Sequence, residues 1–312
     1  MISFYKTLNN CICQIDEYEA GCWINVMAPD KDEIAVLQEK FGVEAEYIRS
    51  SLDEEESSHI ESEDGNTFLI FDVPCVEKDG ENIVYNTMPV GVVVTASNVI
   101  TISLSDNPVI MDFVQGVVKN VQTAHKTQFV LMLLFRMATR FLQYLKQIDR
   151  HSRYLESNLR KSMKNKGLVQ LLDLEKSLVY FQTSLKSNEM TTEKILRGRY
   201  LKLYDEDQEL LEDVLIELKQ AIEMSNIYSS ILSGTMDAFS SVISNNLNVV
   251  MKVLTSLTVL MAIPTMIFSF YGMNIGSNTG LPLAQNMLFP SIVTVVLTAT
   301  VGLILYKKDM FK

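Results

Sequence analysis

Cysteine and histidine are the residue types in this sequence most able to bind metals or to act in catalysis. The pair Cys11-x-Cys13 has close spacing, but no second close pair accompanies it. The other candidates are Cys22, Cys75, His59, His125 and His151. Three histidines spread along the chain in this way do not obviously complete a zinc site. We interpret the cysteines as buried or idle thiols.

The sequence also lacks the usual patterns of catalysis. It contains no glycine-rich phosphate-binding loop, no nucleophile elbow and no histidine pair with metal-ligand spacing. We therefore expect that the protein is not an enzyme and that it needs no ATP. The distribution of charge along the chain points to a different kind of function.

Charged residues are missing from a long C-terminal stretch. From Val253 to Tyr306 there is no Asp, Glu, Lys or Arg, although 21% of the whole chain is charged. A helix needs about 20 apolar residues to cross a bilayer, and this stretch holds two such lengths. We place membrane spans at about 249–270 and 287–306, joined by the outer loop 271–286. A helical hairpin buried in a soluble protein is the alternative, but such helices rarely lack charge over this length.

Basic residues beside the spans predict their orientation. Lys252 borders the first span, the tail 307–312 is basic, and the loop between the spans has no basic residue. The positive-inside rule then places both termini in the cytoplasm and the loop outside the cell membrane. Because the N-terminus lacks the apolar run of a secretory signal, we expect residues 1–252 to stay in the cytosol.

One face of the first span is small or polar. Steps of three and four residues along it give Asn248, Met251, Thr255, Thr258, Ala262, Thr265, Ser269 and Gly272. Such a stripe suits the lining of a pore, but small residues also mark contacts between membrane helices. Pro264 cannot donate a backbone hydrogen bond and should kink the helix. Two spans cannot enclose a channel, so transport would require several subunits around an axis.

The sequence before the spans divides into two parts. Residues 1–125 read as a small α/β domain, with expected strands at 22–26, 67–71, 90–95 and 99–104 and a helix that opens at 29–33. Residues 126–247 read as a helical stalk, and residues 248–306 as the transmembrane domain. No breaker separates the last stalk helix from the first span, so one helix of roughly 95 Å could run from about residue 206 to 270. Such a helix should bundle with copies of itself.

The part of the chain before Val253 is acidic. It carries 24 basic and 37 acidic residues, a formal charge of −13. Such a surface repels nucleic acid and attracts cations, so we expect no nucleic-acid partner. Ordinary solubility is an equally good explanation of the excess of acids.

The segment Tyr271-Gly272-Met273-Asn274, at the outer end of the first span, resembles a motif of the CorA family of magnesium (divalent metal ion) transporters. The run 248–255 before the span, the basic tail and the acidic α/β-plus-stalk front end extend the resemblance over essentially the whole chain. The resemblance implies a funnel-shaped homopentamer whose first span lines the pore and whose second span faces membrane lipid. It also implies passive Mg²⁺ uptake, with a ring of Asn274 amides that selects the hydrated ion and Gly272 allowing the tight turn.

The resemblance carries over to individual positions. Asn248, Met251 and Leu254 fall at the cytoplasmic constriction of the family, and Thr265 and Ser269 lie higher on its lining. Asp213 matches a regulatory Mg²⁺ position, through which internal Mg²⁺ would close the channel.

Two departures from the family pattern stand out. Arg49-Ser50 replaces an acidic pair that should partner Asp213, and the acids at 53–56 would have to substitute for it, unless they are simply a solvated charge run. The outer loop reads Gly280-Leu281-Pro282-Leu283, without the acid common there.

Other functions fit parts of the same pattern. The transported ion could be Zn²⁺, Co²⁺ or Ni²⁺, although the lack of a His/Cys cluster near the span favours Mg²⁺. A membrane-anchored sensor or scaffold is the alternative from another class. That function predicts no ion flux and gives Asn274 no purpose.

Overall fold

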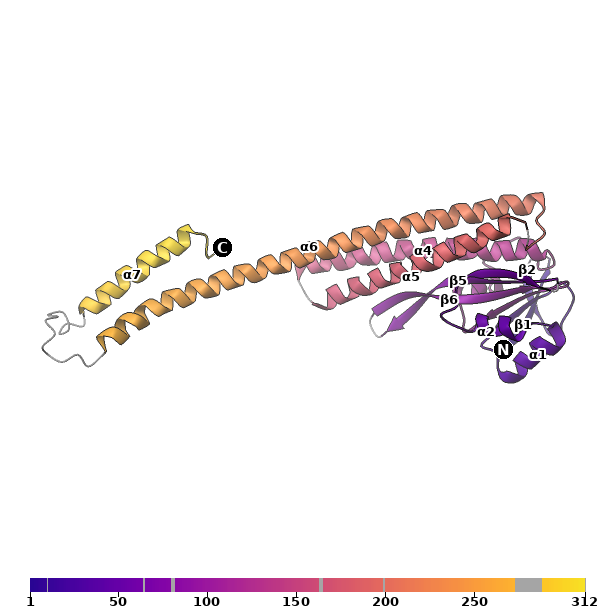
Figure 1. The fold of residues 1–312 in the computed structure, drawn as a ribbon, viewed down its shortest axis with the longest axis horizontal. Helices are drawn as coiled ribbons and strands as arrows, with labels where there is room; N and C mark the ends of the chain where they lie inside the picture. The colour runs from indigo at the N-terminus through magenta and orange to yellow at the C-terminus, as the bar shows by residue number, and fades with distance from the viewer. Residues whose placement is uncertain are drawn as a thin grey trace. The chain divides into compact units, whose positions relative to one another are not determined.

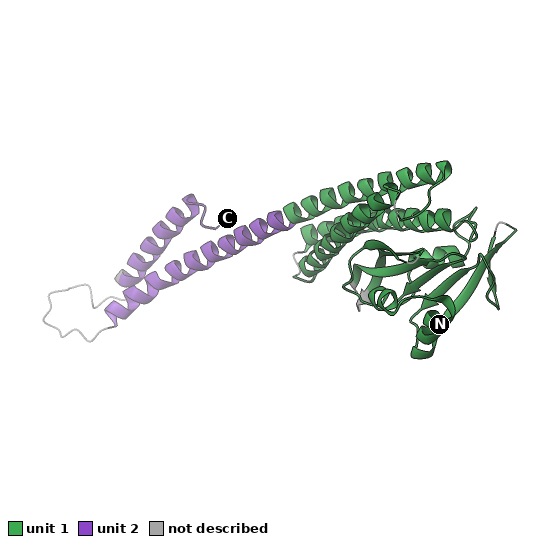
Figure 2. Ribbon diagram, turned by 45° about the vertical axis from the view of Figure 1, so that its right-hand side comes forward, with its two compact units in different colours: residues 1–235 green, residues 236–312 purple. Residues whose placement is uncertain are grey.

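The computed structural model describes residues 1–9, 11–63, 65–79, 82–162, 165–198, 200–272 and 288–311. It separates into two compact units, residues 1–235 and residues 236–312 (Figure 2). The described part of the first unit combines a β-sheet with helices, and that of the second is helical (Figure 1). The expected class, an α/β domain followed by long helices that continue into a C-terminal apolar pair, is confirmed.

A seven-stranded sheet forms the centre of the first unit, with the strand order β2-β1-β3-β7-β6-β5-β4. β3 and β7 pair in parallel, and the other neighbouring strands of the described sheet pair antiparallel. The strands are β1 (Ile2–Leu8), β2 (Cys11–Ile15), β3 (Trp23–Met27), β4 (His59–Glu63), β5 (Asn66–Asp79), β6 (Asn82–Val94) and β7 (Val99–Ser103). All four strands expected from the sequence are present, as β3, parts of β5 and β6, and β7.

One face of the sheet packs against α1 (Lys31–Phe41) and α2 (Ala45–Ser51). Asp30 caps α1 by accepting a hydrogen bond from the Glu33 N–H at 2.8 Å, and the Glu33 carboxylate accepts one from the Asp30 N–H in return. This reciprocal pair fixes the start of the helix expected from the sequence. The shared core contains Leu37, Tyr47, Ile48, Ile24, Phe68, Val93 and Ile100.

The position of α2 depends on a glycine in β6. A Cβ added at Gly91 would lie 1.8 Å from the Ser51 Oγ and 2.6 Å from its Cβ. Ser51 is buried at the end of α2, and its hydroxyl donates to the Tyr47 carbonyl at 2.6 Å. The helix can therefore rest on the strand only because Gly91 has no side chain.

The other face of the sheet is covered by α3 (Pro108–Val114), α4 (Lys126–Lys161) and α5 (Asn165–Leu196). The ring of Trp23 lies 6.3 Å from that of Phe113 in α3 and 5.3 Å from that of Phe129 in α4. Its indole N–H donates to Thr101 at 2.8 Å, so the polar atom of this buried ring has a partner. The helical pattern expected from about residue 126 is α4 and α5, which pack against each other.

Two further helices follow. α6 (Asp205–Tyr271) is a single helix of 67 residues, as the absence of a helix breaker predicted, and α7 is Leu288–Lys307. In the first unit α6 buries Leu211, Val214 and Leu218 at helical spacing, and Ser225 donates to the Leu178 carbonyl of α5 at 3.4 Å. The part of α6 that belongs to the first unit is therefore attached to that unit through α5.

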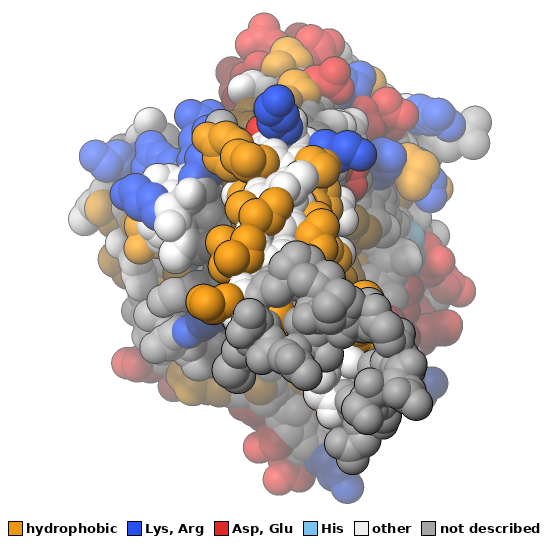
Figure 3. Space-filling view, turned by 90° about the vertical axis from the view of Figure 1, so that its left-hand side faces the viewer, with side chains coloured by type: hydrophobic (Ala, Val, Ile, Leu, Met, Phe, Trp, Pro, Cys, Tyr) orange, Lys and Arg blue, Asp and Glu red, His pale blue; other side chains and the backbone are white. Residues whose placement is uncertain are grey.

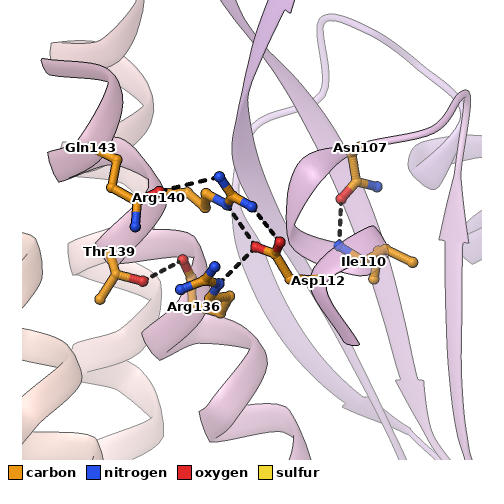
Figure 4. A network of polar contacts seen from close by, with 7 residues as sticks. All are labelled: Asn107, Ile110, Asp112, Arg136, Thr139, Arg140 and Gln143. Atoms are coloured by element: carbon orange, nitrogen blue, oxygen red, sulfur yellow. Dashed lines mark hydrogen bonds and ion pairs between the residues drawn. The ribbon is translucent and has the colours of Figure 1, made fainter. Parts of the chain in front are cut away.

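A buried ion pair connects α3 to α4 (Figure 4). Asp112 is 3% exposed and accepts hydrogen bonds from Arg136, at 2.7 Å, and from Arg140. Burial alone would raise the pKa of Asp112, but the hydrogen bonds from Arg140 and Arg136 outweigh it and hold the pKa below its ordinary value. The carboxylate is thus charged and doubly satisfied at neutral pH.

We expect Asp112→Asn to lower the free energy of unfolding of the full chain by about 3 kcal/mol at neutral pH, because two guanidinium groups lose their buried carboxylate. The pKa of Asp112 is lower in the folded than in the unfolded state. The stabilisation that the Asp112 carboxylate provides is therefore fully present above its unfolded-state pKa of about 3.9. It is lost as the pH falls through the folded-state pKa. The difference between the two proteins should stay constant from neutral pH to about 5 and shrink below about 4. Thermal unfolding in detergent, followed by circular dichroism, measures it.

Arg153→Gln is the matched control, because its pair with Asp149 is exposed on one helix. Exposed pairs of this kind contribute about 0.5 kcal/mol or less. If the Arg153 variant lost as much free energy of unfolding as the Asp112 variant, the buried ion pair would stabilise the fold no more than an exposed one.

Candidate functional site

The second unit contains two helices whose composition suits a membrane. A window of α6 and the segment Pro290–Lys307 of α7 are long and apolar enough to cross a bilayer, and only 6% and 11% of their most apolar windows are buried within the chain. Figure 3 shows hydrophobic side chains gathered over the helices of this unit. Large apolar side chains are exposed on both helices, including Leu254, Met261, Met266, Val295 and Leu303. Water is a poor solvent for such a surface, whereas lipid or neighbouring helices would cover it.

One face of α6 packs against α7 and the C-terminal residues. Ser256 is fully buried, and its hydroxyl lies 2.8 Å from the Lys252 carbonyl and 3.4 Å from that of Met310. A Cβ at Gly302 of α7 would lie 3.7 Å from the Leu260 Cδ2, so the two helices approach closely there. Partly covered residues of α6 continue this face at Leu260, Ile263, Pro264 and Ile267.

The small and polar stripe of α6 lies on the opposite face. Thr265 follows Ile263 by two residues, which at about 100° per residue turns it about 200° away from α7. The same relation holds between Ser256 and Thr258. All of the predicted lining residues are exposed in the single chain, namely Asn248, Met251, Leu254, Thr255, Thr258, Ala262, Thr265 and Ser269.

Two hydroxyl groups of this stripe bond to their own helix. Thr258 donates to the Leu254 carbonyl at 2.8 Å, and Thr265 donates to the Met261 carbonyl at 3.0 Å. Each hydroxyl oxygen keeps lone pairs that point away from the helix axis. The exposed face therefore offers weak neutral acceptors without any fixed charge.

The outer end of α6 contains the first half of the Tyr271-to-Asn274 motif. α6 ends at Tyr271, and the Gly272 N–H donates to the Phe268 carbonyl at 2.9 Å. A Cβ at Gly272 would lie 3.0 Å from that carbonyl oxygen, closer than side chains normally approach. Its φ is not in the left-handed region, so close approach rather than positive φ requires the glycine. Met273 and Asn274 lie outside the described residues, as does the loop to residue 287.

The predicted regulatory residue Asp213 lies on the exposed face of α6. It forms no hydrogen bond or ion pair with any residue that the structure describes. No group of three or more His, Cys, Asp or Glu side chains that could hold a metal is present among the described residues. Within one chain, Asp213 is therefore a single exposed carboxylate.

The segment expected to partner Asp213 lies at the end of α2. Arg49 is exposed, whereas Ile48 is buried in the core beneath it. The acids at 53–56 follow the helix, and the Asp53 carboxylate accepts a hydrogen bond from the Glu55 N–H at 3.0 Å. An open hollow of about 810 Å³ is lined by Ile34, Gln38, Ala45, Ile48, Arg49, Leu52, Asp53, Glu54, Glu55 and Leu104. No hydrogen bond or ion pair connects this segment to Asp213 in the described part of the chain.

The thiols show no sign of reactivity. Cys22 is fully buried beside the amide of Asn98, and burial raises the pKa of its thiol. Burial, together with the nearby Glu77, raises the pKa of Cys75 to about 12. Cys11 is exposed on β2, an edge strand of the described sheet, and Cys13 is half-buried. Thiolates are the reactive form, so the raised pKa values make Cys22 and Cys75 poorly reactive.

Comparison with known proteins connects these features to a family. A model of the family described as CorA-like Mg²⁺ transporter proteins matches residues 18–307. A curated relative, the cobalt/magnesium transport protein CorA of Methanocaldococcus jannaschii, is 28% identical over 280 residues, which are 85% of this chain and 82% of the relative.

Solved structures share the fold over nearly the whole chain. The complete structure of the CorA magnesium transporter from M. jannaschii has a TM-score of 0.80 and 23% identity, and the match covers 98% of this chain and 96% of that one. The full-length CmaX protein has a TM-score of 0.71 and 14% identity, with 99% and 97% of the two chains covered. The sequence match extends from the α/β domain through α6 and α7, and the chain belongs to the family of CorA-like Mg²⁺ transporter proteins.

Proposed function

We propose that this chain forms a homopentameric channel for passive Mg²⁺ uptake across the cell membrane, closed by Mg²⁺ bound on its cytoplasmic side. As a CorA-like protein it is a divalent-cation transporter. The observation that carries the proposal is the position of the small and polar stripe of α6. Its residues from Asn248 to Ser269 are exposed in the described part of the chain, and Thr258 and Thr265 lie opposite the face that packs on α7.

The subunits must come together for this stripe to line a pore. Two helices cannot enclose a water-filled path, and a ring of α6 helices with their stripes inward would. α7 then lies behind α6 and faces lipid, with Val295 and Leu303 among its exposed apolar side chains. Lys252 before the first span and Lys307 after the second place both termini in the cytoplasm.

Ion selection is assigned to a ring of Asn274 side chains at the outer mouth. Mg²⁺ loses its inner waters reluctantly, so a selective ring can accept hydrogen bonds from those waters instead of replacing them. Amide oxygens can do this without the tight hold of carboxylates. A ring of Asp or Glu would bind a divalent ion too firmly for rapid release.

The absence of charge between Val253 and Tyr306 is consistent with this mechanism. Met251 and Leu254 form the constriction toward the cytoplasm, and the hydroxyls of Thr258 and Thr265 supply neutral acceptors above it. The membrane potential drives uptake, with about 2.3 kcal/mol per charge for each 100 mV and roughly twice that for Mg²⁺. No ATP hydrolysis is required.

Gating is assigned to Asp213. Since it has no partner among the described residues of its own chain, a cation bound there would need ligands from another subunit. Mg²⁺ bridging two subunits would favour the closed arrangement, and a fall in internal Mg²⁺ would release it. The acids at 53–56 are the nearest replacements for the missing acidic pair at Arg49-Ser50.

Co²⁺ is the second candidate substrate. The curated relative is named as a cobalt/magnesium transport protein, and the neutral stripe of α6 contains nothing that favours Mg²⁺ over Co²⁺ once both are hydrated. Flux measured with each ion alone and in competition distinguishes the two substrates.

Asn274→Ala should lower Mg²⁺ flux into proteoliposomes on the order of tenfold and remove the preference for Mg²⁺ over other divalent cations, because the waters around the ion lose their acceptors. Asn278→Ala is the matched control, since it removes another amide from the same loop. Normal selective flux in the Asn274 variant would show that Asn274 does not select the ion.

The stripe can be tested at a single depth with two cysteine variants, in a background where Cys11 and Cys13 are replaced by serine. A small cationic thiol reagent should reduce flux through Thr265→Cys and leave flux through Ile263→Cys unchanged. The reason is that Ile263 is on the face toward α7 and Thr265 is turned about 200° from it. Equal inhibition of both variants would contradict a pore along this stripe.

Asp213→Asn should weaken the protection that Mg²⁺ gives the full chain against protease and raise the Mg²⁺ concentration needed to close the channel. Glu212→Gln, a neighbouring exposed acid, provides the control for simple loss of negative charge. If both variants respond to Mg²⁺ as the unmodified chain does, the regulatory site lies elsewhere.

A further inference from the structure

Positive charge is concentrated at one end of the α4–α5 helical hairpin. Residues 146–166 contain seven Lys and Arg and two acids, whereas the rest of the chain contains 20 basic and 36 acidic residues. The described residues of this segment are the last part of α4 and the first residues of α5 (Figure 1). A strongly acidic chain thus has a basic surface at the end of the α4–α5 hairpin.

Part of this charge is not neutralised by acids among the described residues. Arg153 and Arg160 each pair with an acid one turn away, and both arginines are 74% exposed, so these pairs are weak. Lys146, Arg150 and Lys161 are exposed and form no ion pair with any residue that the structure describes. The surface therefore attracts anions.

A cavity of about 350 Å³ opens at this end of the hairpin, with Lys161 and Lys166 in its lining. Its apolar lining comes from Leu155 and Leu159, which are buried between the helices. Its polar lining comes from Asn158, Lys161, Ser162, Lys166 and Gln170. Two lysines with hydroxyl and amide groups above an apolar floor suit a phosphate group attached to an apolar body.

Exposed aromatic and apolar side chains flank the cavity. Tyr154 is 64% exposed one turn before Asn158, and Val169 is 52% exposed just after Lys166. Tyrosine with lysine and arginine around it is typical of surfaces that lie at the boundary between lipid headgroups and water. A free phosphate ion has no apolar part that could contact these side chains.

We propose that the end of the α4–α5 hairpin, where Lys161 and Lys166 line this cavity and Arg160 precedes Lys161, binds the phosphate headgroups of anionic phospholipids. The proposal rests on the chain being a membrane transporter but not on which ion it carries. Nucleic acid is a poorer partner, because the surrounding surface is acidic and the cavity holds a single headgroup. Each Lys or Arg near an anionic bilayer strengthens its binding roughly fivefold, which corresponds to about 1 kcal/mol.

The test uses the full chain in nanodiscs and the variant Tyr154→Trp as a reporter. The native Trp23 is fully buried, so its emission gives a constant background. Phosphatidylcholine with a spin label on its headgroup should quench the new tryptophan more, by roughly twofold, when phosphatidylglycerol is present than when it is absent. Raising the salt from about 0.1 M to about 1 M shortens the screening length from about 10 Å to about 3 Å and should abolish the difference.

The double change Lys161→Glu and Lys166→Glu should weaken binding of the hairpin end on the order of 20-fold and remove the phosphatidylglycerol effect. Lys186→Glu with Lys194→Glu changes the same charge at exposed positions farther along α5 and should leave the effect intact. Circular dichroism and ion flux of both variants verify that the fold is unchanged.

Three outcomes would overturn the proposal. Quenching that does not depend on phosphatidylglycerol would show that the surface does not bind anionic lipid. Loss of the effect with millimolar glycerol phosphate would assign the cavity to a soluble phosphate compound. Binding of an unstructured RNA that requires Lys161 and Lys166 and is independent of lipid would assign the surface to nucleic acid.

Discussion

The constraint on which the second unit depends is that a helix in lipid must satisfy every polar group from within itself. The backbone of α6 does so along its length, and several hydroxyls of α6 and α7 do the same, although the buried Thr298 hydroxyl of α7 has no partner among the described residues. Thr258 and Thr265 donate to carbonyls one turn earlier, as Thr294 and Thr300 do in α7. A helix can therefore carry a polar stripe through a region without charge at little energetic cost. The stripe remains available to water on its open side, and the opposite side packs on α7 through Ser256 and Leu260.

In the first unit, side chains of α5 form hydrogen bonds with backbone groups of the sheet. The β5–β6 ribbon extends beyond its neighbouring strands, since β4 pairs with β5 only as far as Ile70. At the next steps the amide of Asn188 in α5 accepts from the Asp72 N–H and donates to the Asp72 carbonyl, both at 2.9 Å. Ser177 of α5 likewise accepts from the Tyr85 N–H at 3.2 Å. Side chains of α5 thus satisfy backbone groups of both ribbon strands, and the Asp112 ion pair connects α3 to α4.

The sequence predicted elements whose signals are local and strong. The 67-residue α6 was predictable because neither Pro nor a run of glycines interrupts the stretch before Pro264, and β3 and β7 because their apolar runs are nearly continuous. β1, β2 and β4 were missed. β2 and β4 are short, largely exposed edge strands that lack a clear alternation, and the residues that β1 buries are Ser3 and Tyr5, which give no apolar alternation. The contacts of Asp112 and Gly91 were beyond prediction, since each depends on residues far away along the chain that only the fold brings together. For Asn274 the sequence remains the sole guide, because that residue lies outside the described part.

In the proposed channel, α6 lines the path of the ion and the residues after its end select the ion, and helix geometry gives a reason for this difference. A helical face can provide rows of weak acceptors, but its side chains point sideways and backward and leave a wide bore around a symmetry axis. A narrow ring of oxygen acceptors requires residues outside the helical path, and α6 ends at Tyr271, three residues before Asn274. Gly272 is the last described residue there, and its lack of a Cβ lets the chain pass close to the Phe268 carbonyl. In the channel proposed above, Asn274 beyond this glycine would select the ion, and the neutral stripe of α6 would only provide its path.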